Sequence, residues 1–262
     1  MNLEQRVDIS KTTGILDVSR MGLTSLPPLP STLTFLKCTH NQLISLPTLP
    51  NTLQTLRCSH NQLTSLPSLP DSIETLKCPN NHLTSLPELP KALKYLRCDS
   101  NQLTSLPTLP LLMTDLVCDD NQLSILPTIP STLCTLWCDN NQLTSLSKLP
   151  ISLIQLMCCD NKLTSLPILP PMLDELLCEN NPFHPIFAEL TSSSNSQENI
   201  QRIRMYYRNK QKQLENVVNI KNTIAYNCVL NVDCLSLICS FLSGQKGTLS
   251  MQIIDLKTLL QR

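Results

Sequence analysis

The segment LKYLRCDSNQLTSLPTLP, residues 93–110, holds one complete unit of a pattern that runs through most of the chain. Written generally, the unit is L-x-x-L-x-C-x-x-N-x-L-x-x-L-P-x-L-P, and it recurs eight times at intervals of 20 residues. Its asparagine falls at Asn41, Asn61, Asn81, Asn101, Asn121, Asn141, Asn161 and Asn181. A fixed period of this length is typical of a solenoid, in which each coil buries its apolar side against its neighbours.

Each repeat is expected to contain one strand, one inward turn and one extended return. Residues 33–38 illustrate the strand, and parallel stacking of such strands gives one continuous, curved sheet. The asparagine then turns inward, where its amide bonds backbone groups that the turn removes from the sheet. The return, for example residues 43–50, holds too many prolines for a helix and is predicted to be polyproline-like on the convex side. The predicted fold is a leucine-rich-repeat solenoid, a parallel β-sheet horseshoe.

Proline and glycine divide the 262-residue chain into two kinds of structure. All 20 prolines lie between Pro27 and Pro185, whereas the four glycines lie outside residues 23–243. We predict a solenoid of about nine coils over residues 13–190, preceded by a short N-terminal cap at residues 1–12.

The two ends of the array depart from the repeat. In the degenerate first coil, Val18 stands at the cysteine position and Met21 at the asparagine position, as expected of a coil with one side in water. After the last repeat, the serine-rich residues 191–199 predict a linker or helix entry. The period then becomes helical, with Ile200 and Ile203 on one side, so residues 200–262 are predicted to form a small α-helical C-terminal segment.

Eight of the 13 cysteines occupy one repeat position, where strand alternation turns them inward. They are Cys38, Cys58, Cys78, Cys98, Cys118, Cys138, Cys158 and Cys178. Adjacent rungs of this ladder are expected about 4.8 Å apart, but their parallel Cβ vectors give poor geometry for a disulfide. We therefore expect reduced, structural thiols and a reducing, cytoplasmic location. The cysteines lack paired C-x-x-C spacing, and no metal or other cofactor is predicted.

Charge and hydropathy narrow the classes of partner. The formal net charge is zero, so nothing global directs the chain to nucleic acid or to an anionic membrane. The first residues include an acid and no apolar core, which argues against a signal peptide. No apolar run approaches the roughly 20 residues that span a bilayer. A soluble intracellular protein without a membrane partner is the expectation.

One phrase of the repeat resembles a known family. NQLTSLPTLP, which begins at Asn101 and recurs around Asn61, resembles the short LPX-type repeats of bacterial secreted effectors. The resemblance covers about residues 13–183 and implies a solenoid that recognises host proteins. One branch of those effectors adds a large C-terminal ubiquitin-ligase domain with a catalytic cysteine. Only about 80 residues follow the repeats here, too few for that domain, so no catalytic residue is carried over.

Strand alternation also identifies the residues that face outward on the concave surface. The column just before the cysteines changes from four cations to four apolar residues, and the column after them becomes acidic. The candidate partner-binding residues are Lys37, Arg57, Lys77, Arg97, Val117, Trp137, Met157 and Leu177, with Tyr95, Asp119, Asp139 and Asp160 beside them. Duplication of the repeat explains four similar cations. It does not explain why the only tryptophan of the chain lies among apolar residues on a face that is expected to be exposed to solvent. Rimmed apolar clusters of this kind mark partner sites.

These columns support more than one interpretation. The first is a non-enzymatic protein-recognition module with a patch centred on Trp137, Met157 and Asp139. In the second, the C-terminal segment folds over the same residues. The cationic column can instead hold an anionic peptide. Nucleic acid is not expected, because Phe35 and Tyr95 alone make a poor stacking platform.

The sequence contains no catalytic constellation. His40 and His60 share one repeat column and can stack, but a pair without a third ligand is weak evidence for a metal. The scarcity of glycine argues against a nucleotide-binding loop. Cys159 is the one thiol predicted to face out of the sheet, and the acids Asp139 and Asp160 beside it disfavour its thiolate. The chain is therefore predicted not to be an enzyme.

A second resemblance lies near the C-terminus. LNVDCLSLICSFL, residues 230–242, resembles the opening of an F-box, L-P-x-[DE]-x-L-x-x-I-x-S-[FY]-L, as found in repeat proteins of large DNA viruses. Asn231 replaces the usual proline, and no tryptophan-containing second half follows. The resemblance implies an alternative function, in which residues 229–262 dock on a Skp1-like adaptor of a cullin-type ubiquitin ligase while the solenoid recruits a substrate. The docking residues are then Leu235, Ile238, Phe241 and Leu242, which a plain solenoid cap would instead bury on the last coil.

Overall fold

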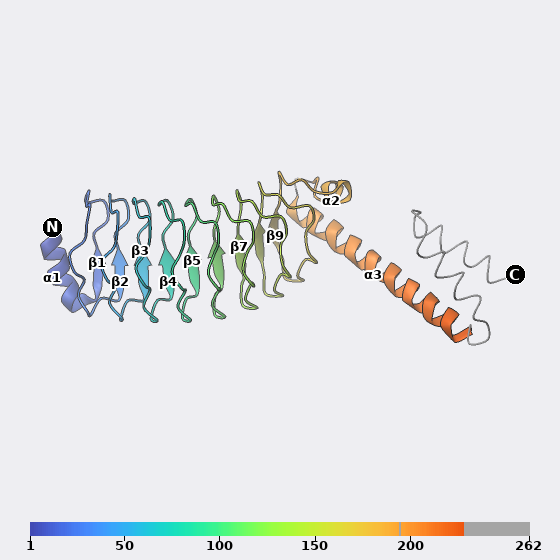
Figure 1. Ribbon diagram of the computed structural model, residues 1–262, viewed down its shortest axis with the longest axis horizontal. Coiled ribbons are helices and arrows are strands. Elements are labelled where there is room, and N and C mark those ends of the chain that lie inside the picture. Colours follow the sequence, from blue (N-terminus) through green and yellow to red (C-terminus); the bar gives the residue numbers. More distant parts are fainter. Residues whose placement is uncertain (194, 228–262) are drawn as a thin grey trace. The chain divides into compact units, whose positions relative to one another are not determined.

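The computed structural model describes residues 1–193 and 195–227. The chain divides into two compact units, Met1–Tyr206 and Tyr207–Arg262. The described elements are, in order, helix α1 (Leu3–Thr13), nine strands, helix α2 (Pro185–Leu190) and helix α3 (Ser196–Asn227) (Figure 1). The strands are β1 (Ile15–Asp17), β2 (Phe35–Lys37), β3 (Thr55–Arg57), β4 (Thr75–Lys77), β5 (Tyr95–Arg97), β6 (Asp115–Val117), β7 (Thr135–Trp137), β8 (Gln155–Met157) and β9 (Glu175–Leu177).

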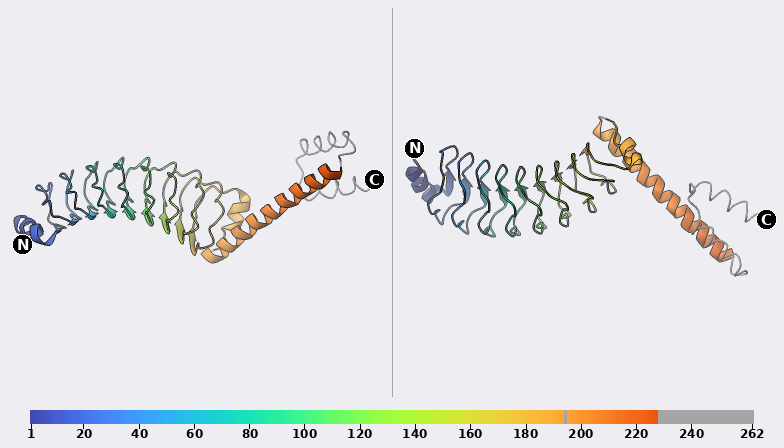
Figure 2. Two further views of the ribbon diagram at one scale, coloured as in Figure 1. Left: turned by 90° about the horizontal axis from the view of Figure 1, so that it is seen from below. Right: turned by 45° about the horizontal axis from the view of Figure 1, so that its top comes forward.

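The strands form one parallel sheet in sequence order, from β1 to β9. The register is constant, so that Leu36 pairs with Leu56, and Leu56 pairs with Leu76. Each strand has three residues, but the ladder continues past it through bonds such as that from Cys38 N to Arg57 O (2.9 Å). The coils of the first unit stack in a gentle arch, with the sheet along its inner side (Figure 2). The predicted leucine-rich-repeat solenoid with a parallel sheet is therefore confirmed.

Every coil turns at a residue in the left-handed conformation. This corner residue directly precedes the asparagine position, and its φ lies between 49° and 57° in all nine described coils. The corner residues are Arg20, His40, His60, Asn80, Ser100, Asp120, Asn140, Asp160 and Asn180. Asparagine and aspartate, which tolerate this region comparatively well, fill five of these positions, and the corner itself is never a glycine. The return segments that follow form neither helix nor strand.

The repeat asparagines bond the backbones of neighbouring coils. Asn61 Oδ1 accepts a hydrogen bond from Leu43 N (3.0 Å) in the preceding coil. Asn61 Nδ2 donates to Cys38 O of that coil and to Cys58 O of its own coil, both at 3.0 Å. The same pattern recurs along the array. Each amide thus satisfies backbone groups that the turn has removed from the sheet, as predicted.

The core consists of stacked rows of leucine and cysteine. Leu36, Leu56 and their equivalents are buried, and the cysteine ladder lies beside them with free thiols. Several of these thiols donate to a carbonyl of the next coil, for example Cys118 Sγ to Trp137 O (3.4 Å). Burial raises the pKa of Cys38 to about 12. The predicted burial of the ladder cysteines in the core is confirmed, and their reduced state stays a prediction.

Helix α1 covers the first coil. The side chain of Asn2 forms a reciprocal capping box with Gln5 at the start of the helix, and Gly14 ends it with φ 71°. A Cβ atom at position 14 would also lie 3.2 Å from Thr34 Oγ1 and 3.3 Å from Thr32 O. Both the positive φ and this close approach therefore favour glycine here. The predicted short cap is therefore helical.

The last coil is covered by α2 and by the first turns of α3, whose Phe187, Ile200 and Ile203 are buried. Ser196 Oγ accepts from Leu176 N (2.6 Å) and donates to Leu176 O (3.0 Å), which satisfies backbone groups at the free edge of β9. The guanidinium of Arg204 donates to the carbonyls of Pro170, Pro171 and Leu173.

The helix boundaries differ from those expected. Helix α2 is not anticipated by the repeat pattern, and Pro185 lies at its start, where proline is compatible with a helix. Helix α3 begins at Ser196, inside the predicted linker at residues 191–199. The reason is that Asn195 Oδ1 caps it by accepting from Gln197 N (2.9 Å).

The F-box-like segment lies outside the described residues. This applies to its four candidate docking residues, Leu235, Ile238, Phe241 and Leu242, so Skp1-like docking stays a prediction. In the part of the chain that the structure describes, none of the helices combines the length and the apolar character that membrane crossing requires.

Candidate functional site

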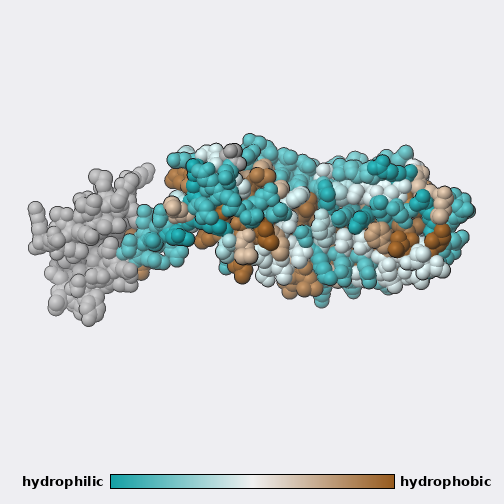
Figure 3. Space-filling model, turned by 180° about the vertical axis from the view of Figure 1, so that it is seen from behind, coloured by the Kyte–Doolittle hydropathy of each residue, from teal (hydrophilic) through white to brown (hydrophobic). Residues whose placement is uncertain are grey.

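The concave face is formed by the outward side chains of β1–β9. In most strands the central leucine is buried and its two neighbours are half-buried, which confirms the alternation that the sequence predicts. The residues that directly precede the ladder cysteines form one continuous column across the strands. The register shows this, since Lys37 pairs with Arg57 and Trp137 pairs with Met157. On the face drawn in Figure 3, apolar side chains lie in separate clusters among polar ones.

Val117 does not belong to the exposed part of this column. Only 4% of its surface is exposed, so its inclusion among exposed partner-binding residues is wrong. Its register partners are Arg97 on one side and Trp137 on the other, and both are much larger. We attribute its burial to cover by these neighbours.

Trp137, Met157 and Leu177 do lie together on three consecutive strands. They are in register on β7, β8 and β9, and Leu177 is 37% exposed while the other two are half-buried. The indole Nε1 of Trp137 is buried and has no hydrogen-bond acceptor among the described residues. We call these three residues the apolar patch.

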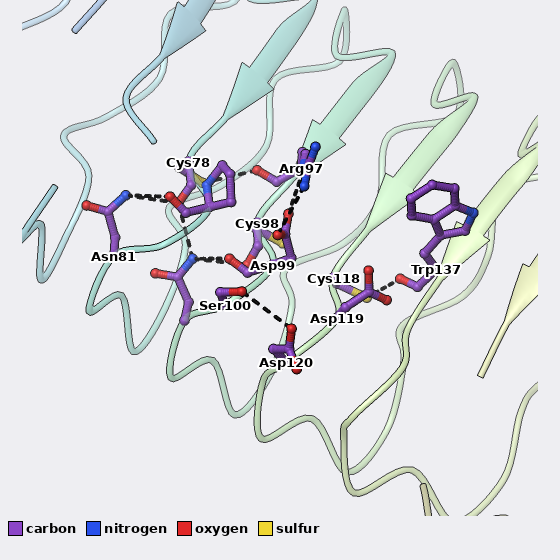
Figure 4. Close-up of polar contacts among 12 residues, drawn as sticks. Cys78, Asn81, Arg97, Cys98, Asp99, Ser100, Cys118, Asp119, Asp120 and Trp137 are labelled. Carbon is purple, nitrogen blue, oxygen red and sulfur yellow. Dashed lines mark hydrogen bonds and ion pairs between the residues drawn. The ribbon is translucent and has the colours of Figure 1, made fainter. Parts of the chain in front are cut away.

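Carboxylates follow one another on successive coils of this face, and Figure 4 shows Asp99 and Asp119 together with Trp137 of β7. Asp119 Oδ1 accepts a hydrogen bond from Asp139 N (2.9 Å), and Asp139 Oδ1 accepts one from Cys159 N (2.6 Å). Burial raises the pKa of Asp119 to about 7, and the carboxylates of Asp139 and Asp99 act in the same direction. Burial also raises the pKa of Asp139. We call Asp99, Asp119 and Asp139 the acidic ladder.

Asp160 is placed apart from the acidic ladder. It occupies the exposed corner position of its coil, where its Oδ1 accepts a hydrogen bond from Asn180 Nδ2 (2.9 Å). Asp99, by contrast, is 7% exposed and belongs to the ladder, although it is not among the candidate residues. Its position, 20 residues before Asp119, is the signal that identifies it.

The four predicted cations differ in their partners. Lys37 Nζ lies 3.1 Å from Asp17 Oδ2, and Arg97 Nε lies 2.7 Å from Asp99 Oδ1. Asp17 is not among the candidate residues either, although it stands one period before Lys37. The other two cations lie over aromatic rings: Arg57 Cζ is 5.4 Å from the centroid of Phe35, and Lys77 Nζ is 4.5 Å from that of Tyr95. The predicted association of Tyr95 with the cationic column is thus present.

The geometry is suited to binding rather than to nucleophilic chemistry. Burial and the nearby Asp139 raise the pKa of Cys159 to about 11, which keeps this outward thiol protonated at neutral pH. His40 and His60 stack with centroids 4.3 Å apart, as their shared column suggests. Across residues 1–193 and 195–227, no cluster of three or more histidine, cysteine or acidic side chains is arranged to hold a metal ion.

Solved structures that resemble this chain include leucine-rich-repeat proteins of bacteria. The leucine-rich effector protein YopM from Yersinia pestis is 30% identical over 67% of this chain and 65% of its own, with a TM-score of 0.51. A Shigella effector leucine-rich-repeat domain is 27% identical over 74% of this chain and 83% of its own, with a TM-score of 0.51. The functional domain of InlJ from Listeria monocytogenes, which includes a cysteine ladder, is 26% identical over 63% and 44%, with a TM-score of 0.52.

The chain spans 65% of the length of the YopM structure and 44% of the InlJ structure. Comparison with protein-family models found no match, and neither did comparison with curated proteins. The chain is therefore a leucine-rich-repeat solenoid with 20-residue, cysteine-containing repeats, and its structural neighbours include effector proteins of Yersinia and Shigella.

Proposed function

We propose that the concave face binds a protein partner through the apolar patch, Trp137, Met157 and Leu177, with the acidic ladder as its polar border. The observation that carries the proposal is the alignment of these three large apolar side chains on consecutive strands of a face whose other outward residues are mostly polar. Tryptophan and methionine are enriched at the centres of protein interfaces, where one or two residues contribute much of the binding energy.

The acidic ladder indicates the chemistry of the contact around this patch. Asp119 and Asp139 are half-buried carboxylates whose pKa values are raised by burial. A lysine or arginine of the partner, placed against them, would favour their charged forms and lower both pKa values. The proposed partner surface therefore carries an apolar group next to a basic one.

The proposed role is recognition without catalysis, in the cytoplasm of a cell. The thiols of the cysteine ladder are buried and free, which fits a reducing compartment. YopM and the Shigella protein are described as effectors, and we extend to this chain the role of an effector-like recognition module. The raised pKa of Cys159 supports binding over nucleophilic chemistry.

The test is capture of partners from a eukaryotic cell lysate with the full chain and with the variant Trp137→Ala/Met157→Ala. The matched control is Ile125→Ala/Ile168→Ala, which removes two exposed apolar side chains from the return segments. Each captured protein is then purified, and its Kd is measured by isothermal titration calorimetry. We expect a loss of at least about tenfold in affinity for the Trp137/Met157 variant and little change for the control.

Circular dichroism is used to check that both variants keep the wild-type fold. Equal affinities of the partner for wild type and the Trp137/Met157 variant would contradict the proposal, and so would a loss confined to the Ile125/Ile168 control. The latter result would place the interface on the return segments.

A further inference from the structure

The cationic part of the concave face contains two paired and two unpaired charges. Lys37 and Arg97 each have a carboxylate partner, in Asp17 and Asp99. Within the described ranges, 1–193 and 195–227, no carboxylate lies at salt-bridge distance from Arg57 or Lys77. Two positive charges on adjacent strands, β3 and β4, are thus left without a counter-charge.

Two free hydroxyl groups lie on the same strands. Thr55 and Thr75 stand two residues before Arg57 and Lys77, so they share the outward face of β3 and β4. The register pairs Thr55 with Thr75 and Arg57 with Lys77, at a strand spacing of about 4.8 Å. All four side chains are half-buried, and the described residues offer no hydrogen-bond partner to either threonine hydroxyl.

The positive charges of Arg57 and Lys77 repel each other, and no carboxylate of the described residues forms an ion pair with either of them. Burial lowers the pKa of Lys77, and the positive charges of Arg57 and Arg97 lower it further. Arg57 Nε is buried and has no acceptor among the described residues. An anion between the two strands would relieve the repulsion and supply acceptors for these donors.

Aromatic rings border the cluster on both sides. Phe35 pairs with Thr55, and Tyr95 pairs with Thr75, so one column reads Phe35, Thr55, Thr75 and Tyr95. The rings lie against the two cations at the distances given above. They reduce the access of water to the flanks of the cluster, and electrostatic attraction is stronger where water is partly excluded.

We propose that Arg57, Lys77, Thr55 and Thr75 form an oxyanion site for a phosphorylated side chain of the protein partner. The proposal rests on the function proposed above, since the partner carries the phosphate to the concave face. A phosphorylated side chain has a charge of about −1.5 to −2 and three acceptor oxygens at neutral pH. It matches two unpaired cations and two hydroxyl donors, whereas a single carboxylate neutralises one charge.

The experiment titrates the full chain with short Gly/Ser peptides by isothermal titration calorimetry. One peptide carries a central phosphoserine, a second an unmodified serine and a third a glutamate. We expect the phosphoserine peptide to bind at least about tenfold more tightly than the other two, with inorganic phosphate as a competitor. Absence of phosphopeptide binding at millimolar concentration overturns the proposal, and so does tighter binding of a single-stranded oligonucleotide.

Two variants and one matched control locate the site. Arg57→Gln removes an unpaired cation, and Thr55→Val/Thr75→Val removes both hydroxyls while keeping β-branched side chains that suit strands. Each should weaken phosphopeptide binding by at least about fivefold. Lys37→Gln removes the same charge as Arg57→Gln from the same column, but Asp17 already pairs with Lys37, so its effect should stay within about twofold.

An equal loss in Lys37→Gln and Arg57→Gln, or no loss in the threonine variant, overturns the assignment of the site. Trp137→Ala/Met157→Ala serves to separate the two proposals, because these residues lie on β7 and β8, away from β3 and β4. The variant should bind the phosphopeptide normally even where it has lost the protein partner.

Discussion

At the scale of single residues, polar side chains join one coil to the next. Asn61 and its equivalents do so inside the solenoid, where both ends of the amide bond backbone groups of neighbouring coils. Asp119 and Asp139 do so on the concave face, where each accepts from the backbone N–H of the following coil. The two kinds of contact differ in the free energy of desolvation, because burying a charged carboxylate costs more than burying a neutral amide that is hydrogen-bonded.

Replacement of a buried asparagine should destabilise the solenoid. In Asn81→Ala, Leu63 N, Cys58 O and Cys78 O lose a hydrogen-bond partner, and we expect the free energy of unfolding to fall by about 2 kcal/mol. Urea denaturation followed by circular dichroism measures this change. Asn51→Ala, at an exposed position, is the control and should have little effect. Equal stabilities of Asn81→Ala and wild type would show that the amide does not hold the coils.

Asp119 should make stability depend on pH in a particular direction. Its pKa is about 7 in the folded chain, against an ordinary value of 3.8 for an aspartate, so the folded state binds more protons between these values. The free energy of unfolding therefore falls as pH rises from about 4 to about 7. Asp119→Asn keeps an oxygen acceptor for Asp139 N. Because asparagine does not titrate, the variant should not show this loss of stability with rising pH.

We expect the stability advantage of Asp119→Asn over wild type to be larger at pH 8 than at pH 4.5 by about 1 kcal/mol, allowing for solvent screening. Urea denaturation of both proteins at the two pH values measures the difference. A difference between the proteins that is the same at both pH values would show that Asp119 has no raised pKa.

At the scale of elements, the strands are short and depend on their neighbours. Their positions follow from the sequence because the 20-residue period fixes register, and the inward alternation of Leu36 and Cys38 fixes which face is buried. The helix boundaries at the C-terminal end were less predictable. The cap at Asn195 is a single side chain, and α2 has only six residues, too few for a periodic signal.

The cover on the last coil should contribute strongly to stability. Ile200 is fully buried, and Ile200→Ala should lower the free energy of unfolding by about 2 to 4 kcal/mol. Met205→Ala, which truncates an exposed side chain of the same helix, is the matched control. Thermal denaturation compares the two, and an equal effect on Tm would mean that α3 does not cover the solenoid.

The cysteine ladder should be chemically protected as long as the chain is folded. Burial raises the pKa of its thiols, to about 12 for Cys38 and Cys78. We expect iodoacetamide at pH 8 to leave the ladder thiols unmodified in the native protein and to label them in 8 M urea. Mass spectrometry of the digested protein measures the labelling. Rapid labelling of the ladder thiols themselves without urea would contradict their burial.

At the scale of the whole molecule, the repeat predicts the fold well and the site only in part. Outward columns follow from the period, so Trp137, Met157 and Leu177 could be found from the sequence. The burial of Val117 could not, because it depends on the size of the side chains on neighbouring strands. The pairing of Lys37 and Arg97 with acids, which leaves Arg57 and Lys77 unpaired, also needed the structure.

The chain holds one tryptophan, and it lies on β7 at one end of the apolar patch. The most direct test of recognition by this patch is therefore a 19F NMR spectrum of the protein labelled with 5-fluorotryptophan, recorded while a captured partner is added. The proposed function predicts that the single resonance of Trp137 shifts or broadens and saturates at the stoichiometry of the complex. An unchanged resonance in a saturated complex would place the partner elsewhere on the solenoid and contradict the account.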